Sequence, residues 1–179
     1  SEIEKVAREI EELLRKVAED NRRMVERVRR LLEEVKTRNK KMVDEVKESN
    51  ERLKDKVRRR NASEEIKKRV DEIVETSKEL LKRSSEEVER IREEVEELLR
   101  RSHETVREVE RRLKDLVRKG GERVEELKRR AERLIEELRK ISEEVERRVK
   151  RLVEELEEIT RRIKEENDKL VREVEKELK

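Results

Sequence analysis

The sequence has 179 residues, of which 59% are Asp, Glu, Lys or Arg, and it contains no Pro, Cys, Trp, Tyr or Phe. Its 54 basic and 51 acidic residues are interleaved and leave a net charge of only +3, which argues against a nucleic-acid-binding face, where basic residues must gather. Without cysteine there are no disulfides, and without a signal peptide or a long apolar run we expect a soluble protein with no targeting signal and no membrane contact.

The first predicted helix covers about residues 2–60, and Ser1 followed by Glu4 forms a capping box at its start. Its apolar residues recur in steps of 3, 4, 4, 3 and 4, which is five turns in eighteen residues. That period of 3.6 belongs to an unstrained straight helix, whereas a heptad period imposes a supercoil. Regular apolar spacing also separates this chain from a disordered one of similar charge.

A chain reversal is predicted at residues 58–63. Three arginines suit the negative end of a helix dipole, Asn61 can adopt the left-handed conformation that ends a helix, and Ser63 can cap the next one. A second helix follows at about 64–118. Gly120 and Gly121 predict the second reversal, and a third helix covers about 122–178.

Short turns between helices of matched length make neighbouring helices antiparallel. We therefore expect an all-α fold: an antiparallel up-down-up three-helix bundle of long, nearly straight helices that forms one elongated unit over 1–179. The alternative is that the helices break at Ser84 and Ser142, because residues 82–87 and 140–145 resemble a helix end followed by a serine cap. A loop at either serine would shift the apolar pattern, and no shift occurs, which favours continuous helices.

We call the recurring apolar positions the seam. Nine of its residues are polar, three in each predicted helix: Asn21, Asn39, Asn50, Ser77, Ser84, Ser102, Ser142, Thr160 and Asn167. Antiparallel partners have a constant sum of residue numbers. Each of the three residues from the second helix sums to 244 with one from the third, and two pairs between the first and second helices sum to 123. Asn50 with Ser77 sums to 127, one turn out of register.

The constant sums predict three cross-bundle layers, each with one polar residue from every helix: Asn21/Ser102/Ser142, Asn39/Ser84/Thr160 and, less regularly, Asn50/Ser77/Asn167. A buried hydroxyl or amide destabilises the fold unless it is hydrogen-bonded, so such layers tolerate only the registers that satisfy them. The alternative is that these residues lie partly exposed at helix edges or bond to their own helix.

No catalytic, cofactor-binding or metal site is predicted. His103 is the only histidine, and a metal site needs several ligands, so it is either a solvated residue or an extension of the layer that contains Ser102. The acidic residues alternate with Arg or Lys at helical spacing, as on a solvated face. We expect neither an enzyme nor a required partner or cofactor.

The eighteen-residue seam, the polar triplets, the two short turns and the Glu/Lys/Arg surface resemble computationally designed three-helix bundles with buried hydrogen-bond layers. The resemblance covers the whole chain and implies a scaffold with no natural biochemical function. The alternative is an interaction protein that forms a homo-oligomer. Apolar doublets beside the seam would supply its interface: Leu31-Leu32, Met42-Val43, Leu98-Leu99, Leu134-Ile135 and Leu170-Val171.

Overall fold

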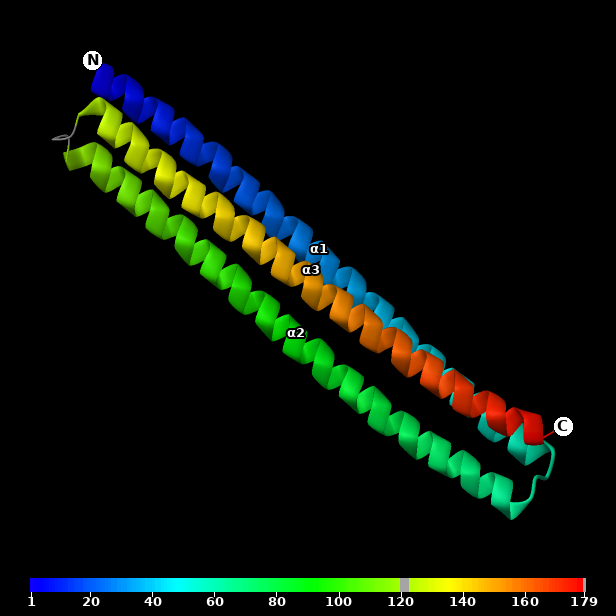
Figure 1. Ribbon diagram of the computed structural model, residues 1–179. Helices are drawn as coiled ribbons and strands as arrows, with labels where there is room; N and C mark the ends of the chain where they lie inside the picture. Colours follow the sequence, from blue (N-terminus) through cyan, green and yellow to red (C-terminus); the bar gives the residue numbers. More distant parts are fainter. Residues whose placement is uncertain (120–122, 179) are drawn as a thin grey trace. The chain divides into compact units, whose positions relative to one another are not determined.

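The computed structural model describes residues 1–119 and 123–178, which form three helices (Figure 1). The helices are α1 (Glu2–Arg59), α2 (Glu64–Lys119) and α3 (Val124–Glu177), and these described residues contain no strand. The predicted all-α fold of three helices is confirmed, with observed ends close to the expected ones. The predicted turn at Gly120 and Gly121 lies outside the described residues.

Local capping chemistry sets the first reversal. The chain leaves α1 through a Schellman motif, in which the Ala62 N–H donates to the Val57 carbonyl at 3.2 Å and the Asn61 N–H to the Arg58 carbonyl at 3.3 Å. Asn61 has a φ of 50°, in the left-handed region. The helix α2 then begins with the Ile66 N–H donating to Ser63 Oγ at 3.3 Å.

The start of α1 is capped in a similar way. The Glu4 N–H donates to Ser1 Oγ at 3.4 Å, and the Lys5 N–H donates to the Ser1 carbonyl at 3.2 Å. Glu2 and Glu4 lie in the first turn, where the helix dipole favours acidic side chains. Of the capping box predicted for Ser1, the structure therefore shows the hydrogen bond that the Ser1 hydroxyl accepts from the Glu4 N–H.

The helices do not break at the two serines in question. Ser84 lies inside α2 and is 0% exposed, and Ser142 lies partly buried inside α3. A capping serine would sit at a helix end with its hydroxyl on the first free N–H groups. The alternative of interrupted helices is therefore wrong.

The contacts divide the chain into two compact units, and each contains segments of all three helices. The first unit comprises residues 1–31 and 93–151, and the second comprises residues 32–92 and 152–179. In both units α1 and α3 run parallel and α2 runs antiparallel to them, as successive hydrogen bonds and ion pairs between the helices show. The single elongated unit over 1–179 stays a prediction.

The seam forms the core of each unit. In the first unit Val6, Ile10 and Val17 pack with residues of α2 and α3 such as Leu113 and Leu138. In the second unit one cluster surrounds Leu53 and Val174, and another surrounds Met42, Val46 and Ile163. Burying these side chains supplies the main driving force for folding.

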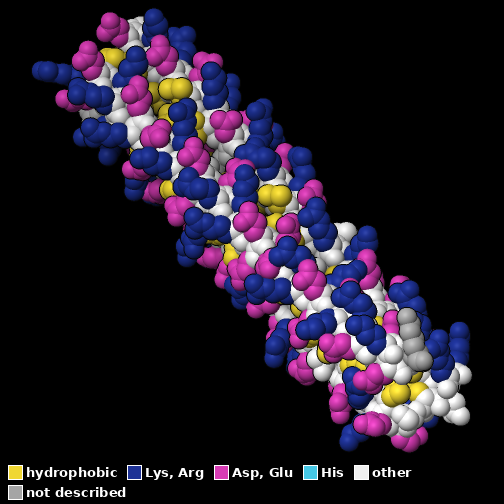
Figure 2. All heavy atoms as spheres, turned by 45° about the vertical axis from the view of Figure 1, so that its right-hand side comes forward, with side chains coloured by type: hydrophobic (Ala, Val, Ile, Leu, Met, Phe, Trp, Pro, Cys, Tyr) yellow, Lys and Arg dark blue, Asp and Glu magenta, His cyan; other side chains and the backbone are white. Residues whose placement is uncertain are grey.

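Charged residues of both signs cover the visible surface, and hydrophobic atoms appear there only in small separate areas (Figure 2). Two large hydrophobic side chains of the described residues are exposed, Ile3 at 41% and Leu13 at 36%. None of the described helices contains a stretch that is apolar enough to cross a membrane.

The Schellman motif leads to a prediction about Asn61. Replacing Asn61 by Ala should lower the free energy of unfolding by about 1 kcal/mol, because a Cβ-bearing residue without a polar side chain is disfavoured in the left-handed region. Asn61→Gly should be neutral or slightly stabilising, since glycine has no such penalty. Chemical denaturation measures both variants, and equal stabilities would contradict this role of the positive φ.

Candidate functional site

The first layer lies in the first unit and joins all three helices through Asn21. Its Nδ2 donates to Ser102 Oγ of α2 at 2.8 Å and also to Ser142 Oγ of α3. Asn21 is 6% exposed and Ser102 is 0% exposed. Both protons of the amide are therefore used, one for each neighbouring helix.

The second layer repeats this arrangement eighteen residues further along α1. Asn39 Nδ2 donates to Ser84 Oγ at 2.7 Å and to Thr160 Oγ1 at 2.9 Å. The Thr160 hydroxyl in turn donates to the Leu156 carbonyl, one turn earlier in α3, at 2.8 Å. The Thr160 hydroxyl thus accepts a hydrogen bond from α1 and donates one within α3, so it acts as both acceptor and donor.

The third layer is organised differently, and its centre is Asn167 of α3. Asn167 Nδ2 donates to Asn50 Oδ1 at 3.3 Å, and the Ser77 hydroxyl donates to Asn167 Oδ1. Ser77 Oγ also lies 2.9 Å from the Ile73 carbonyl, so its single proton serves two acceptors. No hydrogen bond joins Asn50 to Ser77 among the described residues, and Asn167 connects them.

The change of centre follows from register. In the first two layers the α1 and α3 residues are 121 positions apart, but Asn50 and Asn167 are only 117 apart, one helical turn less. A serine or threonine hydroxyl at position 167 would be too short to reach a partner one turn away. An asparagine carries a donor and an acceptor on a longer side chain, and Asn167 uses both while it is 0% exposed.

Other candidate residues stay outside the layers. His103 is exposed on α2, although its neighbour Ser102 is fully buried. No group of three or more His, Cys, Asp or Glu among the described residues is arranged to hold a metal ion. Met24 and Met42, the only two methionines, are both buried in the core.

Sequence reasoning missed a row of ion pairs between α1 and α3. Arg27 binds Glu146 through two hydrogen bonds of 3.1 and 2.9 Å, and the Glu146 side chain is only 19% exposed. The hydrogen bond from Arg27 holds the pKa of the Glu146 carboxyl below its usual value, against partial burial, which raises it. Opposite charges at a constant separation of 119 residues would have revealed this row in the sequence.

The second layer yields the sharpest stability prediction. Asn39→Ala should lower the free energy of unfolding by about 2–3 kcal/mol, because it removes two buried hydrogen bonds and leaves a small cavity. Replacing the whole layer, with Asn39→Leu, Ser84→Val and Thr160→Ile together, should preserve or raise thermal stability while it loosens register or oligomeric state.

Thermal and denaturant unfolding measure both layer variants. Thr37→Ala is a matched control, because that exposed hydroxyl bonds only to the Glu33 carbonyl of its own helix. The control should stay within about 0.5 kcal/mol of the parent. A triple variant that is as unstable as Asn39→Ala would show that the three residues do not act as one layer.

The Glu146 ion pair predicts a pH dependence. A carboxyl whose pKa is lowered by folding adds stability above its unfolded pKa, and this contribution disappears as the pH falls through the folded pKa. Glu146→Gln should therefore lower the free energy of unfolding by about 0.5 kcal/mol at neutral pH and by nothing near pH 2. The exposed Glu143→Gln is the control, and an equal effect of Glu146→Gln at both pH values would refute the pairing.

Comparison with known proteins assigns the chain to no family. No protein-family model matches the sequence. No curated protein and no solved structure is significantly similar to it. The function is therefore argued from the geometry of the layers and of the helix surfaces.

Proposed function

We propose that this chain is a structural scaffold, a de novo designed helical bundle with no natural biochemical function. In this proposal the three buried polar layers specify helix register. The observation that carries it is that each layer contains one polar residue from every helix, joined by hydrogen bonds. Such layers lower stability relative to an apolar core, and their use is to exclude other registers.

The surroundings of the layer residues support a structural role for them. Ser84 and Ser102 are 0% exposed, and each accepts a hydrogen bond from an asparagine. A nucleophilic hydroxyl needs an adjacent base and access to substrate. The proposal therefore includes no catalytic role, no cofactor and no required partner.

A second candidate function is self-association into a homo-oligomer. A surface groove of about 810 Å³ lies between α1 and α2 in the first unit, and its apolar lining includes Leu14, Ala18 and Val117. The exposed Leu13 precedes Leu14 in the chain. These residues supply an apolar area that a second copy could cover.

The apolar doublets give less support to self-association than the sequence suggested. Leu98 is buried at 7% exposure, and Val43, Leu134 and Leu170 pack partly buried against the cores of their own units. Their apolar area is largely used within the chain. This favours the scaffold without a second interface.

Sedimentation equilibrium over a wide concentration range distinguishes the two functions. The scaffold proposal predicts a mass of 22.0 kDa at all concentrations, with the exposed Leu13→Lys behaving like the parent. A mass that is a multiple of this value, returned to a single chain by Leu13→Lys, would replace the scaffold with an assembly component. Lysines placed in an apolar interface are costly to bury, which makes the variant decisive.

A further inference from the structure

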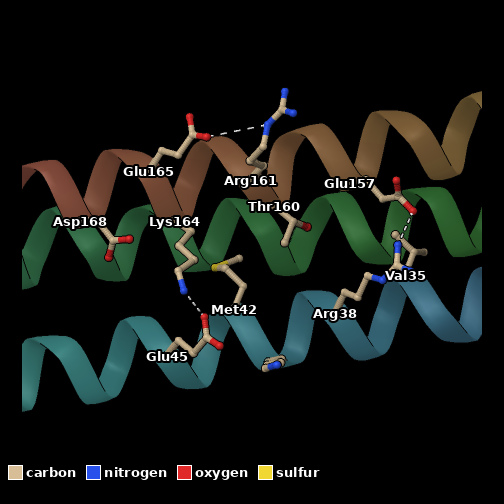
Figure 3. A pocket seen from close by; sticks show the side chains of 11 residues that line it. Val35, Arg38, Met42, Glu45, Glu157, Thr160, Arg161, Lys164, Glu165 and Asp168 are labelled. Carbon is tan, nitrogen blue, oxygen red and sulfur yellow. Dashed lines mark hydrogen bonds and ion pairs between the residues drawn. The ribbon is translucent and has the colours of Figure 1, made fainter.

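The side of α1 that faces α3 and the side of α3 that faces α1, which we call the paired flanks, carry residues of opposite charge at matching positions. Five pairs join them, always with a separation of 119 residues. Their nitrogen–oxygen distances are 3.7 Å for Lys128–Glu9, 2.9 Å for Arg27–Glu146, 2.9 Å for Arg38–Glu157 and 3.2 Å for Lys56–Glu175, and Lys164 also pairs with Glu45. Figure 3 shows two of them, with Thr160 of the second layer between them along α3.

The paired flanks have a defined position relative to the layers. Four of the six flank positions surround the first two layers in the same way: on α1 they lie one residue before or six residues after Asn21 or Asn39, and on α3 three residues before or four residues after Ser142 or Thr160. Asp20 and Arg139 complete the series with a sixth pair of opposite charges, although Arg139 contacts Glu136. The α1 flank is Glu9, Asp20, Arg27, Arg38, Glu45 and Lys56, and the α3 flank is Lys128, Arg139, Glu146, Glu157, Lys164 and Glu175.

An up-down-up chain can place its third helix on either side of the first hairpin, which gives two mirror arrangements. The layers do not separate these arrangements, because their members point toward the axis in both. The flanks do distinguish the two arrangements. In the mirror arrangement the other flank of α1 and the other flank of α3, on the far side of each helix from the paired ones, would face each other.

Those opposite flanks are not complementary. On α1 they are Ala7, Ala18, Val25, Lys36, Val43 and Lys54, and on α3 Arg130, Ile141, Arg148, Ile159, Glu166 and Glu177. In the structure they face α2: Ala18 lines the groove with Leu113, Ile159 packs near Leu80, and Glu177 pairs with Arg69. If these two flanks faced each other, only one of the six facing positions would pair opposite charges. Four positions would place a charged side chain against an apolar one.

We propose that the charge pattern on the facing flanks of α1 and α3 selects one of the two mirror arrangements of the three helices. Each such pair is weak, and selection comes from the five ion pairs together with the opposite charges of Asp20 and Arg139, which all act in the same direction. This inference goes beyond the scaffold proposal and does not depend on it, because it concerns which faces of α1 and α3 meet.

The order of charges also disfavours sliding of α1 along α3. Read along α1 the flank is −−++−+, and along α3 it is ++−−+−. A slide of eighteen residues leaves four facing positions, of which three have like charges, such as Glu9 with Glu146 and Arg27 with Lys164. Like charges that face each other destabilise a pairing and so reject it.

Cysteine cross-linking in the full chain reads out the arrangement, since the chain has no cysteine of its own. One reporter carries Asp20→Cys and Arg139→Cys, on the facing flanks. The other carries Ala18→Cys and Ile141→Cys, which would meet only in the mirror arrangement. Each reporter chain is unfolded, refolded and treated with a short bismaleimide, and the ratio of the two cross-linking yields is measured.

Three charge variants are compared in both reporters. The reversed variant changes α1 alone without altering net charge, by Glu9→Lys, Arg27→Glu, Arg38→Glu and Glu45→Lys. The compensated variant adds the matching changes in α3, Lys128→Glu, Glu146→Lys, Glu157→Lys and Lys164→Glu. The neutral variant replaces the same four α1 residues by Gln.

The proposal predicts a strong preference for the facing-flank reporter in the parent and the compensated variant. In the reversed variant the ratio should fall by about tenfold or more, and in the neutral variant by less. A ratio in the reversed variant within about twofold of the parent would overturn the proposal. If the reversed chain loses its helical circular dichroism, the neutral variant decides: a lower ratio supports selection by charge, and an unchanged ratio refutes it.

Discussion

A buried amide or hydroxyl must find a hydrogen-bond partner, and we infer that this requirement governs how the three helices fit together. Asn21 and Asn39 each have two amide protons and place one on each neighbouring helix. A displacement of α2 or α3 by one turn would leave those buried protons without their present acceptors. The apolar side chains around them supply the energy of folding, but they repeat and therefore accept several registers.

The third layer removes an ambiguity that the first two leave. Asn21 and Asn39 are eighteen residues apart, as are Ser102 and Ser84, so a slide by eighteen residues would still align one complete layer. Asn50 follows Asn39 by only eleven residues, and Asn167 joins it to Ser77 from α3. The irregular spacing and the different centre break the repeat. We infer that the flank charges determine a second property of the bundle, namely which faces of α1 and α3 meet.

Much of this arrangement could be predicted from the sequence, because it depends on local chemistry and on period. The reversal at Asn61 and Ser63 follows from side chains that act within a few residues, and the seam period forecast helices that continue through Ser84 and Ser142. The central position of Asn167 could not be predicted, because it depends on side-chain reach across one turn. Neither could the two compact units, which depend on how whole helices pack. The charge series at a separation of 119 residues, by contrast, is present in the sequence and could have been found there.

The most direct test of the buried layers is NMR hydrogen exchange of asparagine side-chain amides, with the exposed Asn61 as an internal reference. If Asn21 and Asn39 donate both amide protons inside the core, their side-chain amides should exchange at least about 100-fold more slowly than that of Asn61. Exchange of Asn21 and Asn39 as fast as that of Asn61 would show that these amides face water. The layers would then not hold the helices in register.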